Sequence, residues 1–559
     1  MTKKLLFAVI VAFGGQASAL TVEQWRADLD YVVERISVAH ADPWQLVHKP
    51  QFKAHAADLA ARLHQLNDDQ ITVEMMRLVA LLEDGHSKLI PSGENGFRNW
   101  YPLRFHTFTD GIYITAAPAK MTELRGARVD TIAGRPAEQV VADVTALFGA
   151  DNRFGRSTFT FLVSNADVLA ALGLVAPGAS LTLELTVNGQ RLERSVAAEA
   201  GEADFDFRFW GEHFGPPGVE TVASFGTQDP MDFLIAADAD RPLHLRHRAA
   251  YFAEHLRDQS TVYLQINAMT HQSSRVEAPM LEYIADHLAS SQRSPNPAQR
   301  LIVDLRYNFG GDGSMSTDIV NRLLLGFPNA LERGHVFVIT SGATFSAGVM
   351  LTEEILDHMP AILVGQPMGA SWSSYGDAES FTLPESGFQL DVSRRLWQLR
   401  ESDAPRTAIP VHIPLLPNGA EYFAGLDPAV ESILQAATPY PMLDRVLIDM
   451  GAQAAANEFA ALQARWGHLD YWQPVGRMDL EDAADALVAA GRMDDAIEGW
   501  RLNTMIFPDD WDTWDDLGQA CLDAGHIECM REAYSKALML NPSNWNAADQ
   551  REALELHGE

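Results

Sequence analysis

Residues 301–313 read LIVDLRYNFGGDG, and residues 335–356 read HVFVITSGATFSAGVMLTEEIL. Each stretch contains an apolar run with the length and β-branched content of a buried strand. The first run gives way to the glycine-rich NFGGDG, which cannot continue a strand. The second breaks at a Ser-Gly pair before helical periodicity resumes from about Ser346. The two stretches therefore predict a strand with a glycine loop, and a strand with a turn and a helix.

Ser346 lies at the predicted turn between a strand and a helix. The N-terminus of a helix offers free backbone N–H groups and the positive end of its dipole, and both suit a developing oxyanion. A glycine loop after a neighbouring parallel strand can bring a second N–H group to the same point. Ser346 is thus a candidate nucleophile. The alternative is that Ser346 is only a helix N-cap and that the glycines only form a tight turn.

The composition of the chain restricts its class and its partners. Its 559 residues, 47% of them hydrophobic, are enough for about three or four domains with ample core. A net charge of -33 and a pI near 4.8 argue against nucleic acid or anionic membrane surfaces as partners and favour a solvated acidic surface. The two cysteines, Cys521 and Cys529, are too few for a disulfide framework or a cysteine-based metal site.

The N-terminus has the pattern of a secretory signal peptide. Lys3-Lys4 precede the short apolar run Leu5–Phe13, and Ala17-Ser18-Ala19 forms an A-x-A site. We expect residues 1–19 to be removed after Ala19, which predicts an exported protein, periplasmic or extracellular. An uncleaved membrane anchor is the alternative, and no internal segment is apolar enough to span a bilayer.

Residues 20–92 predict an N-terminal helical segment. Apolar residues recur at three- and four-residue spacing over Val22–Ile36, Gln51–Leu66 and Thr72–Leu82. The segment ends in LLEDGHSKLIP, which places His86 just past a helix end. A lone histidine at this position usually compensates the helix dipole.

Residues 100–200 predict a β-rich module with one helix, Ala137–Leu147. Asn188-Gly189 between two alternating runs is a strong hairpin signal. The segments Gly126–Val129 and Thr131–Gly134 resemble part of a PDZ-type domain. The composition of residues 201–258 is mixed and aromatic-rich, and predicts a linker or an irregular insertion.

Residues 259–436 alternate strands with helices, which predicts a parallel or mixed sheet with crossover helices. The strand-like runs are TVYLQIN, LIVDLRYN, HVFVITS and AILVGQP. The segment FTLPESGFQLDVS then predicts an antiparallel hairpin, and Pro405–Leu416 an extended tail.

Residues 440–559 repeat with a period of 34, the tetratricopeptide period. Gly491, Trp500 and Pro508 correspond to Gly525, Tyr534 and Pro542, so the pattern predicts two helical hairpins. Residues 443–473 are a candidate for a third, degenerate unit. We expect this module to be a docking or packing surface for a protein partner. Its two cysteines fall on the two helices of one hairpin, where a disulfide is plausible.

The order of these segments resembles a known family. A helical segment ending in DGH, a β-rich module, DLRYNFGG, TSGATFSAG, GQPMG and FAGLDPAVE follow one another over roughly residues 20–434. This succession resembles the tail-specific or C-terminal processing serine proteases. The resemblance implies an α/β core of the crotonase-like (ClpP/crotonase) fold, with Ser346 as nucleophile. It also implies an oxyanion hole formed by the backbone N–H groups of Ala347 and of Gly310 or Gly311.

The chain departs from the best-known members of this family, which use a Ser–Lys dyad. No lysine stands near Ser371, where that base is expected, or anywhere between Lys120 and Lys536. The chain instead resembles the branch of the tricorn core protease, in which a histidine after the N-terminal helices activates the serine. His86 matches that position and could act as general base.

The other polar residues near these motifs are candidates for supporting roles. Glu401 is the candidate acidic partner of the imidazole by position along the chain, and Asp84 is a local alternative that also suits a helix end. Asp304 and Arg306 belong to the glycine-loop motif and are interpreted as structural, bracing that loop.

Three functions remain open from the sequence. The first is a serine peptidase that hydrolyses peptides or protein tails without a cofactor. The second is a non-catalytic binder of ligands or proteins, since the fold also resembles the repeats of the interphotoreceptor retinoid-binding protein. The third is an esterase, although Thr344 breaks the G-x-S-x-G pattern. No metal site is predicted: His244, His247 and His255 fit no zinc motif and are interpreted as surface residues.

Overall fold

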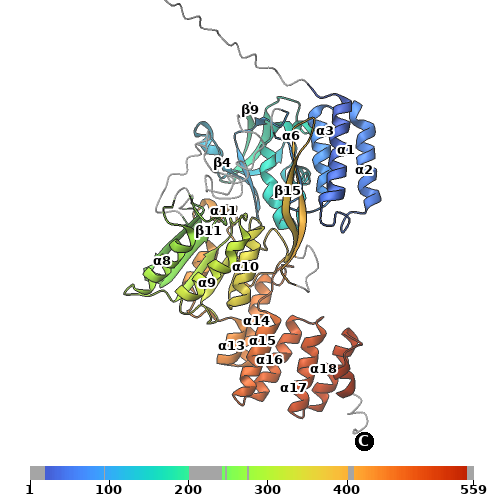
Figure 1. Cartoon of the computed structure of the whole chain (residues 1–559). Helices are drawn as coiled ribbons and strands as arrows, with labels where there is room; N and C mark the ends of the chain where they lie inside the picture. Colours follow the sequence, from blue (N-terminus) through green and yellow to red (C-terminus); the bar gives the residue numbers. More distant parts are fainter. Residues whose placement is uncertain are drawn as a thin grey trace, which may run out of the picture. The chain divides into compact units, whose positions relative to one another are not determined.

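The computed structural model describes residues 19–92, 95–200, 242–245, 249–273, 276–400 and 408–550. Residues 1–18 of the predicted signal peptide, most of the segment 201–258, and Glu401 lie outside these residues. The chain forms two compact units (Figure 1). Unit 1 contains the described residues up to 200 and residues 370–400. Unit 2 contains residues 242–369 and 408–550.

Unit 1 begins with the three helices that the sequence predicts: α1 (Val22–Ala39), α2 (Lys49–Arg62) and α3 (Asp68–Ala80). Two of them start in capping boxes, in which Thr21 pairs with Gln24 and Asn67 with Gln70. The buried residues of α1 recur every three or four positions, because one stripe of the helix faces the core: Trp25, Leu29, Val32 and Ile36.

The β-rich part of unit 1 is an antiparallel sheet. Its strands run in the order β3 (Arg104–Phe108), β4 (Gly111–Ala116), β5 (Arg128–Ile132), β7 (Leu181–Val187) and β8 (Gln190–Val196), and β6 (Arg135–Pro136) pairs with β5. The predicted hairpin is confirmed, since β7 and β8 join through Asn188-Gly189 with φ of 49° and 77°. The predicted helix is α4 (Ala137–Thr145), and the sequence missed α5 (Arg153–Ser157) and α6 (Ala166–Ala171). The short strands β2 (Asn99–Trp100) and β9 (Glu199–Ala200) pair separately.

A second antiparallel sheet of unit 1 joins two distant chain segments. Its order is β1 (Lys88–Ile90), β16 (Gln389–Gln398) and β15 (Ser373–Thr382). The hairpin predicted from FTLPESGFQLDVS is therefore present and longer than predicted. Its partner strand, however, is the one that follows His86 rather than a strand of the α/β core.

Unit 2 contains a five-stranded sheet in the order β10 (Tyr251–Leu256), β11 (Thr261–Ile266), β12 (Arg300–Asp304), β13 (Val336–Thr340) and β14 (Ile362–Gly365). The last four strands are parallel, and β10 is antiparallel to β11. The crossover helices α8 (Met280–Gln292), α9 (Ser316–Gly326) and α10 (Ala347–His358) lie side by side along the sheet (Figure 1). The predicted alternation of strands and helices is confirmed.

One prediction about this region is wrong. The segment through residue 258 was expected to be a linker or irregular insertion, but β10 within it pairs along its full length with β11. Tyr251 and Phe252 are buried there, so the aromatic content of the segment belongs to the core of unit 2.

The strands of unit 2 also pack against helices from the C-terminal part of the chain. Phe337 and Ile339 of β13 share one apolar cluster with Val430 and Ile433 of α12 (Pro428–Gln435) and with Trp466. The short helix α11 (Gly419–Phe423) precedes α12. The tail predicted as extended lies beside β14, where Ile413 bridges to Val364.

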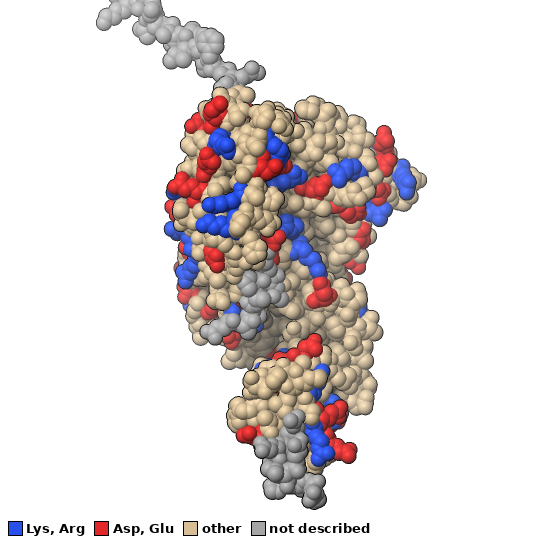
Figure 2. All heavy atoms as spheres, turned by 90° about the vertical axis from the view of Figure 1, so that its right-hand side faces the viewer, with Lys and Arg blue, Asp and Glu red and all other residues tan. Residues whose placement is uncertain are grey.

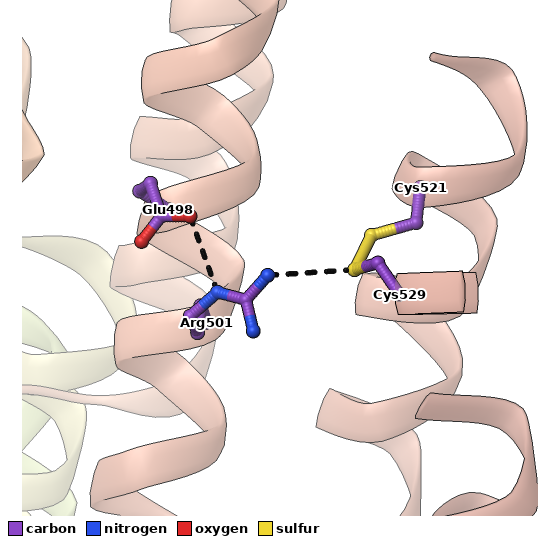
Figure 3. The surroundings of a disulfide bond; sticks show 4 residues. All are labelled: Glu498, Arg501, Cys521 and Cys529. Atoms are coloured by element: carbon purple, nitrogen blue, oxygen red, sulfur yellow. Dashed lines mark hydrogen bonds and ion pairs between the residues drawn. A yellow bond between two sulfur atoms is a disulfide. The ribbon is translucent and has the colours of Figure 1, made fainter. Parts of the chain in front are cut away.

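The C-terminal residues form three consecutive helix pairs. The helices are α13 (Leu443–Met450), α14 (Ala452–Trp466), α15 (Arg477–Ala489), α16 (Met493–Ile506), α17 (Trp511–Asp523) and α18 (Ile527–Leu540). The second and third pairs start and end 34 residues apart, as the sequence period predicts. A Cys521–Cys529 disulfide joins α17 to α18, and Arg501 of α16 donates to the Cys529 sulfur at 3.6 Å (Figure 3).

Acidic and basic side chains are intermixed on the face of the molecule that Figure 2 draws. Across the described part of the chain, none of the helices combines the length and the apolar character needed to cross a membrane.

Candidate active site

The parallel sheet of unit 2 places the glycine loop and the serine turn at one edge. β12 and β13 are neighbours and run in the same direction, so their carboxyl ends lie together. The loop after β12 contains Gly310 and Gly311, and the loop after β13 leads to Ser346 at the start of α10. The carboxyl edge of a parallel sheet is where α/β folds commonly bind ligands.

Hydrogen bonds join the two loops directly. Thr344 Oγ1 donates to the Leu305 carbonyl at 2.7 Å, and Ser341 Oγ donates to the Arg306 carbonyl at 2.5 Å. The Phe345 N–H donates to the Asn308 carbonyl at 2.9 Å. The residues just before Ser346 are therefore fixed to the loop that carries the glycines.

We expect Thr344→Val to destabilise unit 2 by about 2–3 kcal/mol. Thr344 is fully buried, and its hydroxyl also accepts from the Ser341 N–H at 3.0 Å. Valine leaves this N–H without its acceptor, whereas the Leu305 carbonyl still accepts from the Asn308 N–H at 2.9 Å. Urea unfolding measures the effect. Thr352→Val is the matched control: this buried hydroxyl donates only to the Gly348 carbonyl, an acceptor that the helix backbone also uses, so its loss should cost less than about 1 kcal/mol. Equal effects of the two changes would contradict the role given to Thr344.

Ser346 has a strained backbone. Its φ of 52° and ψ of -122° lie in a region that residues with a Cβ rarely adopt. The Ser346 side chain makes no capping hydrogen bond to α10, so the alternative of a simple N-cap is wrong. A serine on a strained strand-to-helix turn is the geometry of a nucleophile elbow.

Gly310 lies directly against Ser346. A Cβ built on Gly310 would be 2.8 Å from Ser346 Cβ and 3.3 Å from the Ala347 nitrogen, and the φ of Gly310 is 113°. At Gly311, with φ of 129°, a Cβ would be 2.2 Å from the Met269 carbonyl oxygen. Both positions therefore require glycine, and Gly310, Ser346 and Ala347 come together in the structure.

The backbone N–H groups distinguish the two glycines. The N–H of Gly310 donates to Oδ1 of Asn308 at 3.0 Å. Among the described residues, the N–H groups of Gly311 and Ala347 have no hydrogen-bond acceptor. Of the two glycines left open by the sequence, Gly311 thus has the N–H that can accept a new partner.

A buried charge network braces the start of the glycine loop. Arg306 Nη2 pairs with Asp304 at 2.9 Å and with Asp427 at 3.0 Å, and Asp427 also pairs with His244 at 2.7 Å. Burial alone would raise the pKa of Asp427, but Arg306 and His244 hold it well below its usual range. The structure agrees with the bracing role predicted for Asp304 and Arg306.

The histidine cluster needs a correction. The prediction that His244 is a surface residue is wrong: it is 1% exposed, because its pairing with Asp427 draws it into the core. His255 is half-buried on β10, and His247 lies outside the described residues. Within the described ranges, no group of His, Cys, Asp or Glu side chains could hold a metal ion.

His86 belongs to unit 1, in the loop between α3 and β1. A Cβ at Gly376 of β15 would lie 3.6 Å from the His86 Cε1, so the half-buried imidazole is beside that strand. Burial lowers the pKa of His86 to about 4, against the raising effect of Asp84, and Lys88 lowers it further. The imidazole is therefore neutral at physiological pH, the form that can accept a proton.

Asp84 contacts the backbone of His86. Its Oδ1 accepts from the His86 N–H at 2.9 Å, and its Oδ2 is 3.2 Å from His40 Nε2. Although burial raises it, the pKa of Asp84 is held well below its usual range by His40 and His86. Asp84 is thus a support for the loop. Sequence reasoning assigned no role to three neighbours of these sites: Asn308 and Lys88, which lie within the DLRYNFGG and LLEDGHSKLIP stretches, and Asp151, which is 66 residues from Gly85 and has no local motif.

Comparison with solved structures places the fold. No protein family and no curated protein matches this sequence. Mature CPAF complexed with lactacystin is 13% identical over 78% of this chain and 99% of that chain, with a TM-score of 0.51. A CPAF mutant is 14% identical over 74% and 96%, with a TM-score of 0.52. The photosystem II D1 C-terminal processing protease is 11% identical over 71% and 95%, with a TM-score of 0.32. The two CPAF structures, whose TM-scores exceed 0.5, establish that this chain is similar to CPAF in fold.

Proposed function

We propose that this protein is a serine peptidase that hydrolyses peptides or protein tails through an acyl-enzyme on Ser346. The observation that carries the proposal is the strained backbone of Ser346, held against the glycine loop at the carboxyl edge of the sheet. Such strain costs of order 1–3 kcal/mol and is kept where function requires it. The fold similarity to CPAF and the DLRYNFGG and TFSAG motifs support the same reaction class.

In the proposed mechanism, the neutral imidazole of His86 takes the proton of the Ser346 hydroxyl as Oγ attacks the scissile carbonyl carbon. The negative charge that develops on the carbonyl oxygen is stabilised by the N–H groups of Ala347 and Gly311. The C–N bond then breaks, and the imidazolium returns its proton to the leaving amine. Water, activated by the same imidazole, hydrolyses the acyl-enzyme. Glu401 is the proposed acidic partner of His86.

We further propose that the protein works outside the cytoplasm. The N-terminal pattern of residues 1–19 supports export, and the Cys521–Cys529 pair fits an oxidising compartment. The C-terminal helix pairs are proposed as tetratricopeptide repeats that dock a protein partner.

Fluorophosphonate labelling tests the proposed function. We expect the probe to modify one serine, which peptide mass spectrometry identifies as Ser346, and to leave Ser346→Ala and His86→Ala unmodified. Hydrolysis of a mixture of quenched peptides, compared with small esters, separates peptidase from esterase activity. A folded wild type that neither reacts with the probe nor cleaves any substrate would contradict the proposal and favour a binding protein.

The dependence of the labelling rate on acidic pH should follow the protonation of His86. Because only the neutral imidazole accepts a proton and the pKa of His86 is about 4, we expect the rate to stay constant from pH 7 to about pH 5 and to fall near pH 4. Lys88→Met removes a positive charge that lowers the pKa of His86. The labelling rate of this variant should therefore begin to fall at a higher pH than that of the wild type. If the wild-type labelling rate fell near the unperturbed histidine pKa of about 6.5, this assignment would be contradicted.

A further inference from the structure

Two buried carboxyl groups hold the loop that carries His86. Asp84 Oδ1 accepts from the His86 N–H at 2.9 Å, and Asp151 Oδ1 accepts from the Gly85 N–H at 2.9 Å. The side chains of Asp84 and Asp151 come from segments 66 residues or more apart, and the residues are 2% and 6% exposed. Two consecutive N–H groups of this loop are therefore fixed by carboxyl oxygens that solvent hardly reaches.

We propose that Asp84 and Asp151 are positioning residues for His86, and that this carboxyl pair sets an upper pH limit for the activity of the enzyme. The inference rests on the proposed function, because it assigns a task to residues that support the proposed general base. Asp84 and Asp151 act through the backbone on either side of Gly85.

The two carboxyl groups have different partners. His40 Nδ1 accepts from the Asp42 N–H at 3.1 Å, so Nε2 carries the ring proton and donates to Asp84 Oδ2 at 3.2 Å. Asp84 is thus compensated as an anion, by His40 and by the His86 N–H. Asp151 Oδ2, in contrast, has no hydrogen-bond partner among the described residues.

These surroundings keep Asp151 protonated at neutral pH. Burial raises the pKa of Asp151 to about 8, the negative charge of Asp84 raises it as well, and the Gly85 N–H lowers it. The other charged groups near His86 are Lys88 and Asp391, on the paired strands β1 and β16. At pH 7 the loop is therefore held by one carboxylate and one neutral carboxylic acid.

Ionisation of Asp151 would disturb this arrangement, because it creates a second negative charge beside Asp84 in a site that excludes water. The backbone of Gly149 packs against that of Asp84, so residue 84 cannot shift toward residue 149: a Cβ on Gly149 would be 2.5 Å from the Asp84 carbonyl oxygen. The repulsion must then be relieved by movement of residues 84–86, which displaces His86. Because the folded-state pKa lies above the unfolded value, the stabilisation from this proton is complete below about pH 4 and lost above about pH 8.

The test compares the wild type with Asp151→Asn between pH 6 and pH 10, measuring the fluorophosphonate labelling rate and the thermal unfolding midpoint. Asparagine keeps an acceptor for the Gly85 N–H and cannot ionise. We expect wild-type labelling to fall about tenfold per pH unit above about pH 8, and the labelling of Asp151→Asn to stay level. Asp151→Ala, which lacks the acceptor, should label slowly at every pH, so rescue by asparagine separates positioning from mere packing.

Asp516→Asn is the matched control. Burial and nearby carboxylates raise the pKa of Asp516 to about 7, but this residue lies on α17 in unit 2. The variant should therefore show the same fall in labelling rate at alkaline pH as the wild type. Parallel loss of labelling in the wild type and Asp151→Asn above pH 8 would overturn the inference.

The inference can be separated from the proposed function by a readout that needs no activity. The NMR signal of the His86 imidazole should shift with a midpoint near pH 8 in the wild type and not in Asp151→Asn. A protein that never labels but shows this difference would refute the peptidase and keep the positioning role. A protein that labels but shows no such difference in the NMR signal would support the peptidase and refute the positioning role.

Discussion

Replacing Ser346 with glycine is expected to abolish acyl transfer and to stabilise the protein relative to Ser346→Ala. The loss of the nucleophile should lower the rate of peptide hydrolysis by about 10³-fold or more, as it does where a nucleophile and a base act as a unit. Glycine adopts a φ of 52° and a ψ of -122° without the strain that alanine and serine share. We therefore expect the free energy of unfolding of Ser346→Gly to exceed that of Ser346→Ala by about 1–2 kcal/mol.

Urea unfolding of the wild type and both variants, together with peptide hydrolysis, measures the two effects. Ser260→Gly is the matched control, because Ser260 also has a positive φ, 47°, in unit 2 but lies at the end of a short turn before β11. That change should also relieve strain, and it should leave hydrolysis unchanged. If Ser346→Gly proved less stable than Ser346→Ala, the backbone at this position would not be strained and the main support for the proposed function would be lost.

Gly310→Ala should be the most damaging change outside the nucleophile. Its Cβ would lie 2.8 Å from Ser346 Cβ, a separation that real Cβ atoms essentially never show, and 3.3 Å from both the Ala347 nitrogen and the Phe345 oxygen. The φ of 113° adds backbone strain to this overlap. We expect a loss of about 3–5 kcal/mol in the free energy of unfolding. We also expect at least about a 10²-fold loss of labelling, because the serine turn must move away from the glycine loop.

Gly491→Ala separates the effect of backbone strain from the effect of steric overlap. Gly491 has a φ of 77° and no atom within 4 Å of a built Cβ, so only the backbone term of about 1 kcal/mol should appear, with normal labelling. Unfolding curves and labelling rates of the two variants provide the comparison. Similar stabilities of Gly310→Ala and Gly491→Ala would mean that the close approach of the glycine loop to Ser346 does not hold the turn in place.

Much of the α/β core could be predicted because its signals are local. The strand Val336–Thr340 has the predicted bounds, since a buried apolar run ends abruptly at Ser341-Gly342. The edge strand β10 gave no such signal. It contains Glu254 and His255 on a half-buried surface, and its pairing with β11 decides its conformation. The period of 34 succeeded at the C-terminus because each repeat packs on its neighbours in the chain.

For the candidate site, too, the features with local signals could be predicted and those that depend on long-range contacts could not. The place of Ser346 between a strand and a helix follows from its flanking sequence, and the need for glycine at position 310 follows from the motif. The strain at Ser346 and the hydrogen bond from the Gly310 N–H to Asn308 depend on the approach of two loops, which no single segment encodes. Asp151 is 66 residues from the N–H group that it holds, and only the folded unit 1 brings it there.

Unit 1 is made of two segments that are far apart in the chain, so it cannot be completed until its second segment, residues 370–400, has been synthesised. On the ribosome, a chain made through residue 369 already contains the glycine loop and Ser346, but it lacks the strand β16 on which β1 pairs. It also lacks the Glu385 and Ser386 N–H groups that donate to the carboxylate of Asp28 on α1, at 2.9 and 2.8 Å. The segment that carries His86 therefore gains its final support only after the nucleophile has emerged. A nascent chain that ends between residues 346 and 369 therefore has the candidate nucleophile without a supported candidate base.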